Sequence, residues 1–284
     1  MPSYRMKIVV LSFDQLSLQS LGCYGNQWLS TPNIDRLATQ SVIFDRCYVE
    51  TVAPGTTSHA WWDGRYRNLV GQSARSLSLF QILHEQGVPL QLLAEGNAAE
   101  HPVRIESRSD WQETSEGEEG TLAELIQQGI QKVEEAAVAD STLIWLKALG
   151  TCSGEIPGIE FIEQYAENEG LEPTEEMLTE WLVIMSQSEL FEQLEPDQQQ
   201  DLNDIFAAAR ILEIDFLVGQ LWEAIQQRPD AAEWSFILTS ASGETSQHLS
   251  TNRVNVPLMI ARPTGQKHAV GMLWLPASIC LSRF

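Results

Sequence analysis

Short, nearly continuous apolar runs recur along the chain, and polar segments with a different periodicity separate them. Apolar runs bounded by turn residues are typical of strands that are buried on both faces. The pattern therefore predicts five strands, at residues 7–13, 88–94, 141–147, 234–240 and 256–262.

Apolar residues recur at steps of three and four in the intervening segments, which predicts amphipathic helices. We expect helices at residues 30–40, 76–87, 121–137 and 202–227. The first has a Ser-Thr cap and Pro32 at its first helical position, and Gly87 is a C-cap candidate for the second. The last carries a single apolar stripe, formed by Ile214, Leu217, Val218, Leu221, Trp222 and Ile225.

Alternating strands and helices predict an α/β fold, in which helices cover both faces of a mostly parallel central sheet. The expected architecture is a three-layer sandwich that forms one domain over residues 1–284. Residues 150–200 differ, because they are rich in Glu and Gln and contain no clear strand. We expect loops and exposed helices there, packed on the edge of the domain.

The formal net charge of −22 is concentrated in an acidic insert at about residues 106–201, which has 24 acidic and three basic residues. Such a surface repels nucleic acids and anionic membranes, so we expect neither as a partner. The simpler interpretation is a solvated, solubilising insert, and the alternative is an acidic recognition surface.

The four cysteines lie far apart, and no CxxC pair indicates a zinc site or a redox motif. Free thiols in a reducing compartment are the expected state. The first apolar run is too short for a secretory signal, and no run approaches the roughly 20 residues that span a bilayer. These features predict a cytoplasmic protein.

The segment from Lys7 to Tyr66 resembles the sulfatase branch of the alkaline phosphatase superfamily. A strand ending in an acid is followed by "LGCYGN", by "TPNIDRLA", by an aromatic strand and by a Pro-containing turn closed by Gly-Arg. Later, "ILEIDFLVGQLWEAI", "WSFILTSASGE" and "NVPLMIARPTG" follow in the family's order. The resemblance implies an alkaline-phosphatase-like fold. Family members usually carry a C-terminal subdomain, which we expect to be absent because only residues 277–284 follow "VGMLWLP".

The resemblance also implies a divalent-cation site with oxygen ligands after the first strand and after the late strand. Asp14 matches the first of two adjacent acids, but Gln15 stands at the position of the second. Ala241 and Ser242 replace the Asp-His pair after the late strand. A single carboxylate seldom holds a divalent ion, so we expect vestigial positions and no bound metal. The alternative is a cation such as Ca²⁺ or Mg²⁺, and Asp14 is otherwise interpreted as a loop or helix cap.

The family's nucleophile turn corresponds to "VAPGTTSHAWWDGRY", which lacks both the family's Cys and its turn Arg. Thr56 or Thr57 stands near the nucleophile position, and His59 follows. Without a metal or a nearby base to activate it, a hydroxyl is a poor nucleophile. The family's Gly-Lys-Trp-His stretch corresponds to residues 95–100, "EGNAAE", which contain neither Lys nor His. We therefore expect these catalytic positions to be vestigial.

Two further hypotheses concern the same region. Glu244 and His248 could complete an unorthodox site with Asp14. Trp61, Trp62 and Trp222 could line a ligand pocket, although core packing is the simpler role, above all for Trp222.

Taken with the resemblance, these residues predict a sulfatase-like protein without catalytic activity that binds or assembles with an unknown protein or small molecule. The alternative is an active metal-dependent hydrolase of sulfate or phosphate esters with an atypical site. A third hypothesis is a structural remnant within a larger complex.

Overall fold

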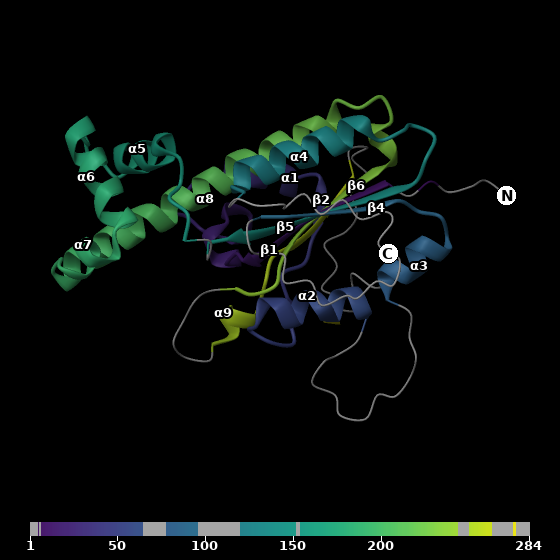
Figure 1. Ribbon diagram of the computed structural model, residues 1–284, viewed down its shortest axis with the longest axis horizontal. Coiled ribbons are helices and arrows are strands. Elements are labelled where there is room, and N and C mark those ends of the chain that lie inside the picture. The colour runs from purple at the N-terminus through teal and green to yellow at the C-terminus, as the bar shows by residue number, and fades with distance from the viewer. Residues whose placement is uncertain are drawn as a thin grey trace.

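A mixed, mostly parallel sheet forms the centre of the protein, as the strand pattern predicts (Figure 1). The computed structural model describes residues 5, 7–64, 78–95, 120–151, 154–243, 250–262 and 275–276. Its six-stranded sheet has the order β2-β7-β6-β1-β5-β4. The strands are β1 (Lys7–Gln15), β2 (Ser41–Ile43), β4 (Leu90–Ala94), β5 (Thr142–Gly150), β6 (Trp234–Ser240) and β7 (Leu258–Ala261). A short pair, β3 (Cys47–Tyr48) and β8 (Leu275–Pro276), forms a second sheet.

All five predicted strands are present, and β4, β5, β1 and β6 run parallel to one another. β7 runs antiparallel to β6 and is shorter than predicted. It begins only after Pro257, which has no N–H group to donate to a strand neighbour. The N–H of Val256 instead donates to the carbonyl of Cys47, at 2.8 Å.

Helices cover both faces of the sheet (Figure 1). α1, α4 and α8 lie on one face, and α2 and α3 lie on the other. The helices are α1 (Pro32–Ala38), α2 (Pro54–Asp63), α3 (Leu79–Glu85), α4 (Leu122–Glu135), α5 (Ile159–Asn168), α6 (Glu175–Ser186), α7 (Ser188–Glu192), α8 (Pro196–Gln226) and α9 (Thr251–Val254). Among the described residues, short 3₁₀ helices also form at Leu18–Ser20, Gly22–Tyr24 and Ala231–Glu233.

A hydrophobic cluster lies on each face of the sheet, between the strands and the helices that cover that face. Two clusters form because successive side chains along a strand point to opposite faces. Val9 and Leu11 of β1 pack in the cluster shared with α1, α4 and α8. Ile8 and Val10 pack in the cluster shared with α2 and α3. The three-layer arrangement predicted from the sequence is therefore confirmed.

α8 begins at Pro196, six residues before the predicted start. Glu195 and Gln198 form a reciprocal capping box around that Pro, so a polar stretch without apolar periodicity still starts the helix. The predicted apolar stripe of α8 is buried, and Trp222 stacks on Phe236 with ring centroids 5.9 Å apart. Core packing of Trp222 is thus confirmed.

Helix α1 is capped from a distance rather than by its own Ser-Thr pair, which corrects the predicted local cap. The hydroxyl of Thr31 accepts a hydrogen bond from the N–H of Gly22 at 2.9 Å. The carboxylate of Asp215 in α8 accepts from the N–H groups of Asn33 and Ile34, at 3.2 and 2.8 Å. Asp215 therefore satisfies the first N–H groups of α1 and fixes it against α8.

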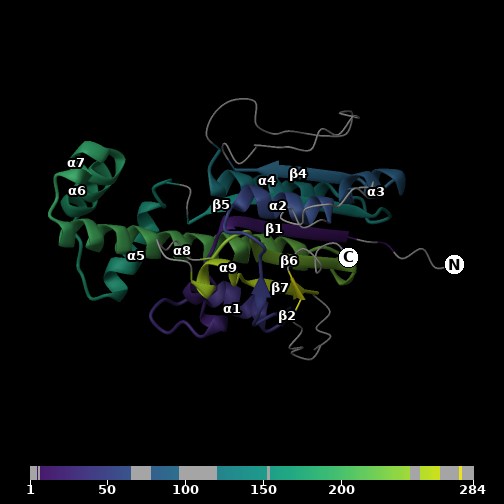
Figure 2. The same ribbon diagram turned by 90° about the horizontal axis from the view of Figure 1, so that it is seen from below.

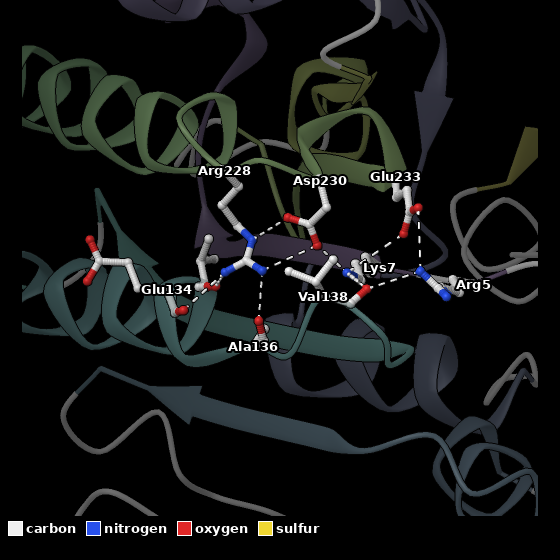
Figure 3. Close-up of polar contacts among 9 residues, drawn as sticks. Arg5, Lys7, Glu134, Ala136, Val138, Arg228, Asp230 and Glu233 are labelled. Atoms are coloured by element: carbon white, nitrogen blue, oxygen red, sulfur yellow. Dashed lines mark hydrogen bonds and ion pairs between the residues drawn. The ribbon is translucent and has the colours of Figure 1, made fainter.

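A buried ionic cluster closes the amino end of the sheet (Figure 3). Lys7, at the start of β1, donates a hydrogen bond to Asp230, which also accepts from Arg228 at 2.7 Å. The Arg228 guanidinium donates further bonds to backbone carbonyls at the end of α4, among them that of Val133 at 2.6 Å and that of Ala136 at 2.7 Å. The cluster thus joins β1 to the carboxyl ends of α4 and α8.

Residues 154–195 form the exposed helices that the sequence predicts for this acidic segment. Figures 1 and 2 show α6 and α7 at the far end of α8, beyond the sheet. No helix among the described residues is long and apolar enough to cross a membrane.

Candidate functional site

The carboxyl ends of β1 and β6 lie side by side, which is where the sequence places its candidate residues. The two strands pair in parallel as far as Phe13 and Ser240. Just beyond, the N–H of Ala241 donates to the carbonyl of Phe13 at 2.7 Å. Asp14 and Ala241, which follow the first and the late predicted strand, therefore lie at one end of the sheet.

Two serines at the end of β6 and just beyond it, Ser240 and Ser242, form hydrogen bonds that join this segment to the end of β1. The hydroxyl of Ser240 accepts from the N–H of Leu16 at 2.8 Å and donates to the carbonyl of Ser242 at 2.6 Å. The hydroxyl of Ser242 donates to the carbonyl of Asp14 at 2.8 Å. Ala241 is fully buried between them. Ala241 and Ser242, which stand at the positions of the family's second pair of metal ligands, thus form hydrogen bonds that join the ends of β1 and β6.

The side chain of Asp14 faces a buried lysine. Lys147 of β5 places its Nζ 3.4 Å from Oδ1 of Asp14, and the two side chains are 6% and 13% exposed. Burial raises the pKa of Asp14, and the positive charge of Lys147 partly offsets that effect. The interpretation of Asp14 as a loop or helix cap is therefore wrong, because its carboxylate belongs to an ion pair.

Sequence reasoning missed Lys147 as a site residue. It is the one charged residue within the buried run "TLIWLKALG". A buried ammonium group requires a partner, because its transfer from water is otherwise costly. That signal was present in the sequence, although it did not say which acid the lysine meets.

A second ionic pair lies nearby, at the ends of β4 and β5. The carboxylate of Glu95 meets the guanidinium of Arg210 at 2.9 Å and accepts from the N–H of Leu149 at 2.7 Å. Arg210 also donates to the carbonyl of Gly150 at 3.2 Å. Burial raises the pKa of Glu95 to about 7, against the opposing charge of Arg210. The pair anchors α8 to the carboxyl end of the sheet.

The donor set near Asp14 does not fit the divalent cation that the family resemblance implies. Ala241 has no donor atom, and Ser242 uses its hydroxyl on a backbone carbonyl. Gln15 contributes an amide without charge, and Lys147 brings a positive charge to the remaining carboxylate. Within the described part of the chain, no group of three or more His, Cys, Asp and Glu side chains could hold a metal ion.

Helix α2 contains the candidate nucleophile residues. Thr57 is buried, and its hydroxyl donates to the carbonyl of Thr51 at 3.3 Å, whereas Thr56 is half-buried. The ring of the half-buried His59 lies 5.8 Å from that of Trp62.

The two tryptophans of α2 belong to the core. Trp61 and Trp62 are buried, and their ring centroids lie 6.4 and 6.0 Å from that of Trp145 in β5. They pack between α2 and the sheet, so the simpler of their two predicted roles is the correct one.

The start of α2 lies at the same end of the sheet as Asp14. The chain enters α2 shortly after Val49, whose N–H donates to the carbonyl of Val254 in α9 at 2.9 Å. Figure 1 shows α9 beside one end of α2, on the side where β1 and β6 finish. Thr57 lies one helical turn before Trp61 in α2, so it is nearer to the end of the helix that faces the carboxyl ends of the strands. The start of α2 and the ion pair of Asp14 and Lys147 therefore lie toward the same end of the sheet.

Other predicted residues lie outside the described part of the chain. Glu244, His248 and residues 96–100 belong to this group, as do Cys152 and Cys280. Of the remaining two cysteines, Cys47 is buried and Cys23 is half-buried.

The sequence matches a known protein family over most of its length. The family model Sulfatase matches residues 7–273. An N-acetylglucosamine-6-O-sulfatase of Bacteroides thetaiotaomicron is 31% identical over 62 residues. That alignment spans 22% of this chain and 11% of the relative.

Solved structures share the fold at low sequence identity. A protein from a glycosaminoglycan-metabolism locus of Bacteroides thetaiotaomicron superposes with a TM-score of 0.70 at 14% identity, covering 98% of this chain and 71% of its own. A phosphonate monoester hydrolase of Agrobacterium radiobacter superposes with a TM-score of 0.59 at 14% identity, covering 92% and 68%.

Proposed function

The chain belongs to the sulfatase family, and we propose that it is a member that hydrolyses no sulfate ester and instead serves in binding or assembly. The ion pair between Lys147 and Asp14 is the observation that carries this proposal. Asp14 is the acid that remains at the position of the family's cation site, and its partner here is the ammonium group of Lys147.

A divalent ion beside Asp14 would lie close to the ammonium group of Lys147, a buried residue. Like charges repel strongly in a poorly solvated environment, and a hard cation needs several anionic oxygens to replace its hydration shell. Asp14 alone cannot supply them. The same lysine that stabilises the carboxylate therefore opposes a metal at this position.

Without that cation, the hydroxyls of α2 lack an activating group. Thr57 donates its proton to a backbone carbonyl, and no described carboxylate or imidazole accepts it. Ester hydrolysis needs an activated nucleophile and positive charge where negative charge develops. Loss of one such group can cost about 3–4 kcal/mol of transition-state stabilisation, so their combined loss removes useful turnover.

An active hydrolase of sulfate or phosphate esters is the alternative, and two observations favour it. Lys147 places a buried positive charge at the end of the sheet toward which the Thr57 turn lies. A neighbour in the comparisons is a phosphonate monoester hydrolase with the same fold. In this alternative Lys147 would neutralise the ester's anionic oxygens while Thr56 or Thr57 attacks.

A side-by-side assay decides between the two functions. Purified wild type and the variants Thr56→Ala, Thr57→Ala and Asp14→Ala are incubated with aryl sulfates and aryl phosphates, with and without Mg²⁺ or Ca²⁺. The proposal predicts no turnover above the buffer rate in any sample. Turnover by the wild type that one of these substitutions abolishes would instead establish the active hydrolase.

The proposal also includes the protein's location in the cell and the kind of partner that it binds. We place the protein in the cytoplasm without a metal cofactor, where it binds a protein or a small molecule. The acidic surface argues against nucleic acids and anionic membranes as partners.

A further inference from the structure

Arg210 of α8 is the one basic residue among residues 148–227, which also contain 18 acidic residues. Its side chain is buried at the carboxyl end of the sheet, where its guanidinium meets carboxylates from three parts of the chain. Glu95 follows β4 and lies 2.9 Å from Nη2, and Glu155 precedes α5 and lies 3.3 Å from the same nitrogen. Glu213 of α8 lies 2.8 Å from Nη1. Three acids therefore share one positive charge.

The charges of this cluster balance only if it holds a proton. Fully ionised, the three acids exceed the arginine by two negative charges, and Glu95 is almost completely buried. Like charges repel strongly in a poorly solvated environment. Burial is the main cause that raises the pKa of Glu95 to about 7, against the opposing charge of Arg210. The negative charge of Glu155 and a hydrogen bond between the two glutamates add to the rise, so protonated Glu95 and ionised Glu155 stabilise one another.

Other charged residues of the neighbouring elements are directed away from Glu95 in the described part of the chain. Lys147 of β5 alternates with residues that pack toward α8, so it points to the opposite face of the sheet, where it meets Asp14. The acidic residues of α4 and α5 are exposed, and Lys132 of α4 pairs within its own helix. Asp215 of α8 accepts hydrogen bonds from α1. The three partners named above therefore control the ionisation of Glu95.

Glu155 is the acid that Arg210 holds least firmly. Its distance to the guanidinium is the longest of the three, and its side chain is 26% exposed, against 1% for Glu95 and 12% for Glu213. Glu213 lies one turn from Arg210 on the same helix, which keeps the two side chains together. Ionisation of Glu95 therefore drives Glu155 toward water, and with it residues 154–158, which we call the entry segment.

The entry segment leads into α5, and the rest of α5 has contacts of its own. The ring of Phe161 lies 5.7 Å from that of Phe216 in α8, and Ile162 is buried in the core. The carbonyl of Gly158 accepts hydrogen bonds from the N–H groups of Phe161 and Ile162, at 2.9 and 3.4 Å. Movement of the entry segment therefore frees the first turn of α5 while the apolar contacts of that helix hold it on α8.

We propose that Glu95, Glu155 and Arg210 form a proton-operated latch, which holds the entry segment against the sheet while the two glutamates share a proton and lets it open when both are ionised. The latch is independent of the proposed binding role and needs no ligand. It explains why the one basic residue of this acidic stretch is buried at its base rather than exposed among its acids.

Hydrogen exchange of the full chain, followed by mass spectrometry between pH 5 and pH 8, tests the latch. Exchange times are corrected for the intrinsic rate at each pH. The opening constant of residues 159–162 should rise at least about tenfold as the pH climbs to about 7, because the closed state binds the proton more tightly than the open state, and it should level off above that pH. Exchange in β1 and β6 should show no such rise.

Two variants remove the repulsion in different ways. Glu155→Gln puts an amide that can donate to the Glu95 carboxylate in place of the repelling charge, so the entry segment should stay closed at every pH. Glu95→Gln mimics the protonated carboxyl group and should have the same effect. Glu163→Gln, at an exposed position of α5, should keep the wild-type pH profile. Melting curves show whether each variant folds, and Glu155→Gln decides alone if the buried Glu95 change unfolds the protein.

Three results would overturn the latch. The first is an opening constant of residues 159–162 that does not change with pH in the wild type. The second is a pH-dependent rise that Glu155→Gln retains, because the repulsion between the two glutamates would then not be its cause. The third is an equal rise in β1 and β6, which would show that the whole domain opens rather than the entry segment.

Discussion

The ammonium group of Lys147 lies 3.4 Å from the carboxylate of Asp14, at the end of the sheet where β1 and β5 finish. Asp14 is the acid that the sulfatase resemblance assigns to a metal. Because Lys147 is buried in β5, its charge is poorly solvated, and the carboxylate of Asp14 stabilises it. The pair therefore couples the stability of the sheet to a position that the family uses for chemistry.

Lys147→Met should lower the free energy of unfolding by about 3–5 kcal/mol, because it leaves the Asp14 carboxylate buried without its partner. Urea unfolding at pH 7 measures the change. Asp14→Asn/Lys147→Met should recover most of the loss, since neither charge remains. A single variant within about 1 kcal/mol of the wild type would show that the pair is solvated.

The strands of this fold could be predicted because buried parallel strands carry their signal locally. The runs at β1 and β6 are apolar at nearly every position, so burial on both faces follows from the residues themselves. The antiparallel direction of β7 could not be predicted in this way. It depends on where the preceding chain crosses the sheet, which no local pattern encodes.

Glu95 should make stability fall as the pH rises between about 4.5 and 7. Its pKa is raised from 4.5 to about 7 in the folded protein, mainly by burial. Between these pH values the carboxyl group of Glu95 keeps its proton in the folded state and has released it in the unfolded state. The contribution of Glu95 to the free energy of unfolding is therefore complete below pH 4.5 and is lost as the pH rises to about 7.

Urea unfolding at several pH values checks this slope. Glu95→Gln should flatten it, whereas the exposed Glu163→Gln should retain it. An unchanged slope in Glu95→Gln would show that another group is responsible.

Asp230 should give the opposite dependence at acidic pH. Burial alone would raise its pKa, but hydrogen bonds from Arg228 and Lys7 outweigh that effect and hold the pKa well below its usual range (Figure 3). A lowered carboxylate pKa stabilises the fold above its unfolded value near 3.8, and that contribution disappears as the pH falls toward the lowered pKa.

Asp230→Ala should cost about 3–5 kcal/mol at pH 7, because Lys7 and Arg228 lose their common partner. It should also remove the acid-induced loss of stability. Glu233→Gln is the matched control, since Glu233 lies 3.7 Å from Lys7 and its side chain is 40% exposed. A similar cost for both variants would contradict a dominant role for Asp230.

The location of the candidate site could be predicted from the sequence, but the ion pairs that form there could not. Asp14 and Ala241 follow two recognisable strands, so their placement at one end of the sheet could be expected. Neither the pairing of Asp14 with Lys147 nor that of Glu95 with Arg210 could be foreseen, because each joins residues more than 100 positions apart. Such contacts depend on strand order and on the register between β1 and β5.

We propose that Lys147, rather than a divalent cation, is the charge partner of Asp14, and calorimetric titration of the purified wild type with Mg²⁺ and Ca²⁺ tests this proposal most directly. We predict no saturable heat, and no rise in melting temperature with either ion, because a ligand that does not bind the native state cannot stabilise it. Gln15→Asp/Ala241→Asp/Lys147→Met should acquire measurable affinity, since it adds two carboxylates and removes the opposing charge. Saturable binding by the wild type that Asp14→Ala abolishes would contradict the account.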